Sequence, residues 1–187
     1  MEKVEKRVLD AISLAVQWHK RTARKNAIQG HFVPYIVHPM EVMKSCYTIG
    51  AGHPDILCAA VCHDLLEDTD VPWPKLLKVV GPEAGQIVQE LTFNEKKMSQ
   101  ETYIKTFATA SVPALVIKAM DRIANVKDFS LTDIGYAKKY YEKGAEIFEY
   151  AQARGGELDA YFETESVRLK LEDIVADLVN HVFFWNA

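Results

Sequence analysis

The stretch that decides the fold runs from Ile56 to Asp68 and reads ILCAAVCHDLLED. Its first half is apolar on every side, which predicts a helix buried in the middle of a domain. At about 100° per residue, the ionisable residues of its second half share one side of a continuous helix. These residues are His63, Asp64, Glu67 and Asp68. Burying three carboxylates beside a histidine is costly unless a positive charge compensates, so this cluster predicts a divalent metal ion.

A second polar group lies in an otherwise apolar helical segment, ALVIKAMDRIANV at residues 114–126. Its polar members recur at helical spacing and form a single stripe. They are Lys118, Asp121, Arg122 and Asn125. One interpretation is an amphipathic helix with a solvated face. The other is a stripe that faces a cleft, with one metal ligand and neighbours that hold a phosphate or a ribose.

A second histidine precedes a proline in the segment PYIVHP, residues 34–39. Pro39 suits the first turn of a helix, so we expect His38 at a fixed helix entrance rather than on a mobile loop. Two imidazoles and two carboxylates would suit Mn, Fe, Zn or Mg, and the nitrogen ligands make Mg the least favoured.

The rest of the chain shows helical rather than strand-like periodicity, which predicts an all-α fold. We expect one helical bundle over residues 1–187, with the motifs in a core of about 5–150 and the last helices at 133–184. The expected helices lie at about 4–18, 39–49, 54–68, 75–80, 82–91, 100–110, 111–129, 133–153 and 157–184.

Composition narrows the functional class. The chain has 187 residues, of which 49% are hydrophobic, and a formal net charge of -4. A nucleic-acid binder would carry a basic excess, so we expect no nucleic-acid partner. We see no stretch as apolar as a membrane span or a signal peptide, and expect a cytoplasmic protein without a membrane partner. The three cysteines are expected to be free and buried.

The three motifs together resemble the HD superfamily. More narrowly, they are similar to the hydrolase domain of the RelA/SpoT group and its stand-alone small alarmone hydrolases, which include the metazoan SpoT homologue. The segments are PYIVHP at residues 34–39, AAVCHDLLEDT at 59–69 and KAMDRIAN at 118–125. An adjacent His-Asp pair alone is a weak signal, but the three spaced motifs are specific together.

This resemblance implies a helical HD-domain bundle that hydrolyses the 3′-pyrophosphate of ppGpp or pppGpp to GDP or GTP and pyrophosphate. It implies a metal ion, usually Mn²⁺, held by His38, His63, Asp64 and Asp121. It implies that Glu67 and Asp68 position and deprotonate the attacking water. The residues that it places at the nucleotide are Arg24, Lys25, Lys118, Asn125 and Tyr140. The loop at residues 26–33 is longer than the family pattern, which bears on where Arg24 and Lys25 lie.

Other interpretations stay open at this point. The same metal chemistry would serve a hydrolase of another nucleotide, such as NADPH or ppApp. A non-catalytic nucleotide sensor is the other alternative, although a sensor need not keep the Glu67–Asp68 pair. The apolar cluster at residues 182–185 suits either a core or the interface of a homo-oligomer.

Overall fold

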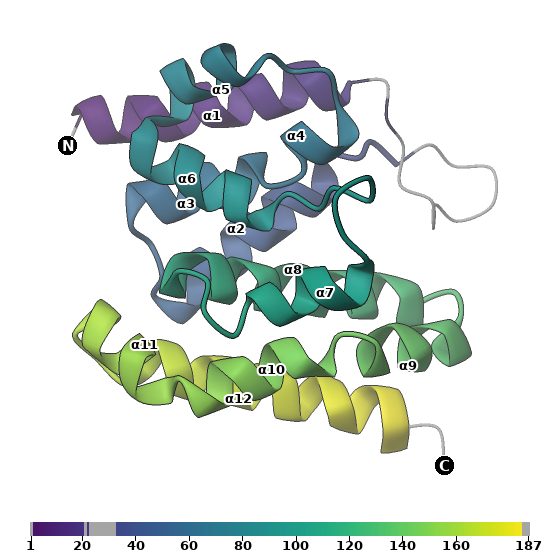
Figure 1. Cartoon of the computed structure of the whole chain (residues 1–187). Coiled ribbons are helices and arrows are strands. Elements are labelled where there is room, and N and C mark those ends of the chain that lie inside the picture. The colour runs from purple at the N-terminus through teal and green to yellow at the C-terminus, as the bar shows by residue number, and fades with distance from the viewer. Residues whose placement is uncertain (1, 21, 23–32, 185–187) are drawn as a thin grey trace.

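The computed structural model describes residues 2–20, 22 and 33–184, and helices make up most of these ranges (Figure 1). The prediction of an all-α fold is confirmed. The first half of the chain contains α1 (Glu2–His19), α2 (Val37–Ile49), α3 (Pro54–Cys62), α4 (Leu65–Asp68), α5 (Trp73–Val80) and α6 (Pro82–Leu91). The second half contains α7 (Gln100–Thr106), α8 (Val112–Ser130), α9 (Ile134–Glu142), α10 (Ala145–Ala153), α11 (Gly155–Phe162), α12 (Ser166–Val179) and a π-helical turn, η1 (Asn180–Phe184).

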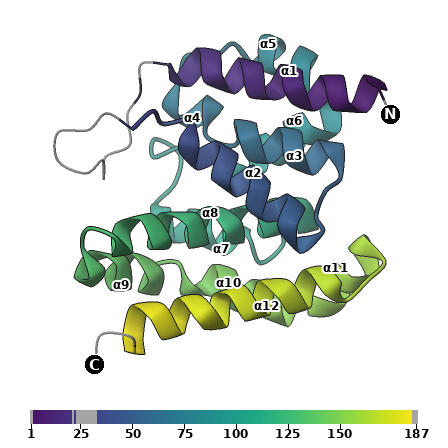
Figure 2. The same ribbon diagram turned by 180° about the vertical axis from the view of Figure 1, so that it is seen from behind.

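Two buried helices form the centre of the molecule. Helix α3 packs against α1, α2 and α6, and its residues from Cys58 to Cys62 are completely buried. Helix α8 packs against α2 on one side and against α9 and α10 on the other. Figures 1 and 2 show α1 at one end of the molecule and α12 at the other, with α2, α3 and α8 between them. The prediction of a buried central helix is therefore confirmed.

The expected helix over residues 54–68 is interrupted, so the prediction of one continuous helix is wrong. Helix α3 ends at Cys62 and α4 begins at Leu65, which leaves His63 and Asp64 in the turn between them. The His63 ring Nδ1 lies 2.8 Å from the carbonyl oxygen of Ala60, the carbonyl that a continuous helix would pair with residue 64. The backbone of Asp64 then starts a new turn, since its carbonyl accepts from the Asp68 N–H at 2.8 Å.

The two long C-terminal helices that the sequence predicts are also each divided. The expected helix at 133–153 separates into α9 and α10 at Gly144. The expected helix at 157–184 ends at Phe162 and resumes at Ser166, with Glu163 in the left-handed region at φ 54°. The expected break between residues 153 and 157 is present at Arg154, and Gly155 already begins α11.

Gly144 is the place where a side chain from the central layer enters the corner between α9 and α10. The guanidinium of Arg122 in α8 fills this corner, and a Cβ at position 144 would lie 1.9 Å from its Nη2. Arg122 is 3% exposed, and its Nη2 donates to the Tyr140 carbonyl at 3.1 Å. The absence of a side chain at position 144 therefore lets a buried arginine fasten α9 to α8.

All three cysteines are buried and free, as the sequence predicts. Burial raises the pKa of Cys46 to about 12, so this thiol stays protonated at neutral pH. Within the described part of the chain, no helix has both the length and the apolar character needed to cross a membrane.

The packing at Gly144 predicts that Gly144→Ala destabilises the protein by about 1–3 kcal/mol, because the added methyl group would displace the Arg122 guanidinium. Gly156→Ala is the matched control, since nothing lies within 4 Å of a Cβ there. We expect the control to change stability by less than about 1 kcal/mol. Urea denaturation of both variants measures the difference, and equal free energies of unfolding would contradict the assigned packing.

Candidate active site

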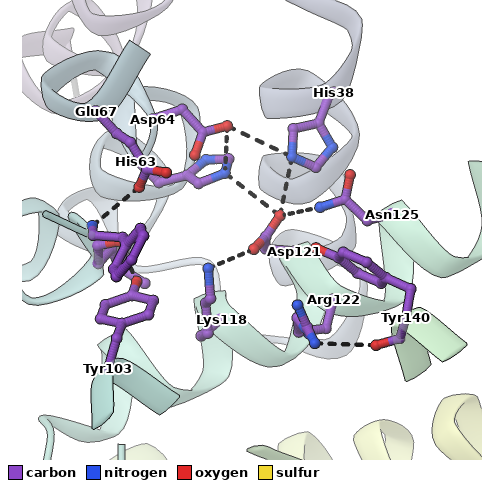
Figure 3. Close-up of polar contacts among 12 residues, drawn as sticks. His38, His63, Asp64, Glu67, Tyr103, Lys118, Asp121, Arg122, Asn125 and Tyr140 are labelled. Carbon is purple, nitrogen blue, oxygen red and sulfur yellow. Dashed lines mark hydrogen bonds and ion pairs between the residues drawn. The ribbon is translucent and has the colours of Figure 1, made fainter. Parts of the chain in front are cut away.

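Three separate parts of the fold bring the predicted metal ligands together (Figure 3). His38 lies in the first turn of α2, His63 and Asp64 lie between α3 and α4, and Asp121 lies in the middle of α8. The Nε2 atom of His38 is 3.0 Å from Asp121 Oδ1, and that of His63 is 3.0 Å from Asp64 Oδ2. The two crossed pairs, His38 with Asp64 and His63 with Asp121, are both 3.7 Å apart.

The donor atoms of this cluster fit a divalent metal ion. The ligand atoms of His38, His63 and Asp64 all lie within 4.8 Å of one another. His63 is 1% exposed, and its Nε2 is buried without a hydrogen-bond partner of acceptable geometry. Because its Nδ1–H donates to the Ala60 carbonyl, the lone pair of a neutral ring is on Nε2, beside the carboxylates. A buried, unsatisfied nitrogen next to two carboxylates is an arrangement that a metal ion satisfies.

Electrostatics favour a positive charge at the same point. Burial lowers the pKa of His63, but Asp64 and Asp121 outweigh this effect and raise the pKa to about 10. Burial would raise the pKa of Asp121, whereas Lys118 and the two histidines hold it well below its usual range. Both carboxylates are therefore ionised and face the imidazole nitrogens.

Neighbouring side chains fix the orientation of the two carboxylates. The Tyr35 hydroxyl donates to Asp64 Oδ2 at 2.5 Å. Lys118 Nζ donates to Asp121 Oδ2 at 2.9 Å, and Asn125 Nδ2 donates to Asp121 Oδ1 at 2.6 Å. Outer-shell hydrogen bonds of this kind hold metal ligands in place and tune their basicity. The polar stripe of α8 thus faces the cluster rather than solvent.

A cavity of about 370 Å³ opens beside the cluster. Most of its charged lining residues are acidic, with two basic side chains among the described ones. Its lining residues are Thr22, Tyr35, His38, Asp64, Glu67, Asp68, Phe93, Gln100, Tyr103, Ile104, Lys118, Asp121, Arg122, Asn125, Phe129 and Tyr140. The volume falls within the range of small-molecule sites.

Glu67 and Asp68, the predicted water-activating pair, both line this cavity from α4. Glu67 Oε2 accepts a hydrogen bond from the backbone N–H of Phe93 at 3.0 Å. Partial burial is the main influence on the Glu67 carboxyl and raises its pKa, against the opposing effect of the Phe93 N–H. A carboxylate with a raised pKa is a better proton acceptor than an ordinary glutamate.

Three of the five predicted nucleotide-binding residues line the cavity, and the other two lie outside the described residues. Lys118, Asn125 and Tyr140 line the cavity, and the first two are also bonded to Asp121. The Tyr140 ring lies against the Arg122 guanidinium, with the ring centroid 4.1 Å from the guanidinium carbon. Arg24 and Lys25, with the loop at 26–32, lie outside the described residues.

Sequence reasoning missed several residues that the cavity brings together. Phe93 and Tyr103 lie outside all three motifs, and only their packing places them beside Glu67 and Lys118. Tyr35 stands inside the segment PYIVHP, so its position before His38 was a usable signal. The other lining residues without a sequence signal are Thr22, Gln100, Ile104 and Phe129.

Comparisons with known proteins place this geometry in context. No protein-family model matches the chain. The guanosine-3′,5′-bis(diphosphate) 3′-pyrophosphohydrolase of Aquifex aeolicus is 32% identical over 121 residues, which cover 62% of this chain and 17% of that protein. The Drosophila melanogaster protein of the same name, MESH1, is 25% identical over 172 residues, which cover 89% of this chain and 91% of that protein. The predicted resemblance to stand-alone alarmone hydrolases is confirmed.

One further relative agrees with this resemblance to the stand-alone alarmone hydrolases, and one solved structure agrees with the fold. Human MESH1 is 28% identical over 162 residues, which cover 81% of this chain and 88% of that protein. A solved structure of a metazoan SpoT ortholog, described as hydrolysing ppGpp, matches with a TM-score of 0.71 at 22% sequence identity. The match covers 91% of this chain and 94% of that one, which establishes the fold.

The geometry of the predicted ligands indicates that Asp64→Ala should weaken the binding of Mn²⁺ by more than about 100-fold, because the variant would lack a predicted ligand rather than an outer-shell partner. Asp70→Ala is the control, since Asp70 is exposed and lies just beyond α4. Titration of each purified variant with Mn²⁺, followed by calorimetry, measures the affinity. Unchanged binding in Asp64→Ala would show that the cluster is not the metal site.

Proposed function

We propose that the chain is a metal-dependent phosphohydrolase that removes pyrophosphate from the 3′ position of ppGpp or pppGpp, giving GDP or GTP. The observation that carries this proposal is the meeting of two imidazoles and two carboxylates beside a cavity lined by Glu67 and Asp68. Support also comes from relatives of similar length, such as MESH1, which are named for this activity.

The proposed metal ligands are His38, His63, Asp64 and Asp121, and the proposed ion is Mn²⁺. Nitrogen and oxygen donors in this ratio suit Mn²⁺, Fe²⁺ or Zn²⁺ better than Mg²⁺. Such an ion supplies Lewis acidity: it would polarise a phosphoryl oxygen and lower the pKa of water.

The chain's own carboxylates would manage the proton of the attacking water. Glu67 would accept the proton, and Asp68, beside it on α4, would orient the water toward the phosphorus. The water oxygen forms a bond to phosphorus while the bond from this phosphorus to the ribose 3′ oxygen breaks. A proton is then returned to the 3′ oxygen, so pyrophosphate and the nucleotide leave as separate products.

Charge balance suggests how the nucleotide would be held. Lys118 is paired with Asp121, and the Arg122 guanidinium is held at Tyr140, so the described lining leaves little free positive charge for a polyphosphate. We therefore assign the remaining phosphate charge to Arg24 and Lys25 together with the metal. Asn125 and Tyr140 would face the ribose and the base from α8 and α9.

Two wider features belong to the same proposal. We place the protein in the cytoplasm, where free buried thiols such as those of the three cysteines are stable, and we assign it to the stringent response. The partner that we propose for this site is the guanosine polyphosphate nucleotide.

The proposal predicts that the purified protein with Mn²⁺ releases pyrophosphate from ppGpp faster than it releases phosphate from NADPH or pyrophosphate from ppApp. The reason is that the site is assigned to a guanosine 3′-pyrophosphate. Chromatography of the products measures all three reactions. A preference for NADPH or ppApp would assign a different nucleotide, and binding of ppGpp without turnover of any substrate would make the protein a sensor.

Glu67→Gln is expected to keep metal binding and to lose turnover by roughly 100- to 10,000-fold, because the amide cannot accept the proton. Glu83→Gln, on the exposed start of α6, is the matched control. Steady-state kinetics on ppGpp and a Mn²⁺ titration separate the two effects. Turnover at the parent rate in Glu67→Gln would exclude Glu67 as the proton acceptor.

The raised pKa of Glu67 gives the expected pH dependence. A general base acts in its deprotonated form, so turnover is present above the pKa of Glu67 and falls as the pH drops through it. The acid limb of kcat should therefore lie at a higher pH than the pKa of an ordinary glutamate, which is about 4.3. A pH series of kcat measures this limb, and a limb at or below the ordinary value would contradict the assignment.

A further inference from the structure

The proposed base, Glu67, depends on a contact from a distant part of the chain. Its side chain is exposed to the cavity, and its helix α4 spans only Leu65–Asp68. The hydrogen bond from the Phe93 N–H therefore supplies a restraint that α4 itself does not provide. Without it, the carboxylate would sample several rotamers.

We infer that Tyr103 is a positioning residue that holds Phe93 against Glu67. This inference rests on the proposed function, and it concerns a residue in none of the three motifs. Tyr103 lies in α7 and is 5% exposed.

Tyr103 holds the Phe93 segment at two points. Its hydroxyl donates a short hydrogen bond to the carbonyl of Leu91, the last residue of α6. Its ring lies 5.3 Å from the Phe93 ring, centroid to centroid. Both ends of the Leu91–Phe93 segment are thus fixed to one side chain, so the Phe93 N–H points at Glu67 with little freedom.

The ring of Tyr103 is itself held from two directions. Phe107, which is completely buried, packs against it edge-on with ring centroids 5.2 Å apart. Lys118 Nζ lies 5.2 Å from the Tyr103 ring centroid, a cation–π contact, and the same ammonium group donates to Asp121. Figure 3 shows Tyr103 below Glu67 and beside Lys118.

These contacts form one continuous chain from Glu67 through Phe93, Tyr103 and Lys118 to Asp121. The charged groups around the Glu67 carboxyl are Asp64, Asp68 and Lys118, so the Phe93 N–H is the neutral donor among them. This N–H lowers the pKa of Glu67, against the raising effect of burial. Loosening Phe93 should therefore move the Glu67 pKa upward.

Tyr103→Phe tests the inference because it removes the hydroxyl and keeps the ring. We expect kcat on ppGpp to fall roughly tenfold, since a misplacement of about 1 Å can lower a rate by up to about 100-fold. KM and the affinity for Mn²⁺ should stay unchanged. We also expect the acid limb of kcat and the Glu67 pKa, followed by carboxyl NMR, to move to higher pH. Exchange of the Phe93 amide hydrogen should become faster.

A second variant and a matched control complete the design. Phe93→Leu keeps the backbone donor and removes the ring contact, and it should shift the Glu67 pKa in the same direction. Tyr150→Phe removes a different tyrosine hydroxyl, which donates to Glu146 at 2.8 Å within α10. This control should leave kcat, the Glu67 pKa and Phe93 exchange unchanged.

The outcomes separate this inference from the proposed function. If Tyr103→Phe and Phe93→Leu leave the Glu67 pKa and the exchange of the Phe93 amide at the parent values, the positioning role is wrong, even in an active enzyme. If the parent protein hydrolyses no nucleotide but both variants shift the Glu67 pKa, the positioning contact stands and the proposed function fails. A lowered melting temperature with neither shift would mean a purely structural role for Tyr103.

Discussion

The structure depends on one costly arrangement, in which two imidazoles and two carboxylates meet in a nearly dry place. His38, His63 and Asp121 are each less than 5% exposed, so their charges cannot be screened by water. The surrounding fold offsets this cost with three hydrogen-bond donors, Tyr35 on Asp64 and, from α8, Lys118 and Asn125 on Asp121. Most residues of the two central helices, α3 and α8, are buried and apolar, and the cluster lies where the end of α3 meets polar side chains of α8.

The sequence predicts which residues meet at this centre because the relevant signals are local. Each motif is a short run of residues in which polar side chains interrupt an apolar helix, and the structure brings all of the predicted metal ligands together. The predicted geometry of the segment AAVCHDLLEDT, residues 59–69, was nevertheless wrong. Periodicity assumes a continuous helix, whereas the chain turns at His63 and Asp64 and still places both beside Asp121. Residue spacing alone cannot show that a side chain competes for a backbone carbonyl.

Contacts between distant segments were the part that the sequence could not supply. Tyr103 and Phe93 show no pattern of their own, and their place beside Glu67 follows from how α6 and α7 pack around α8. The division of the predicted helix at 133–153 has the same origin. Gly144 ends one helical run because a buried arginine needs the space, and that arginine comes from 22 residues earlier in the chain. A need for space of this kind becomes visible only when the helices are packed against one another.

The seating of Arg122 at Gly144 has a consequence for the width of the cavity. Tyr140 forms part of the wall, and its ring rests on a guanidinium that is itself wedged into the backbone corner between α9 and α10. The guanidinium behind the Tyr140 ring therefore has little space in which to move away. If Tyr140 contacts the nucleotide as proposed, a cavity that is wider at this point would require a different backbone at the α9–α10 corner.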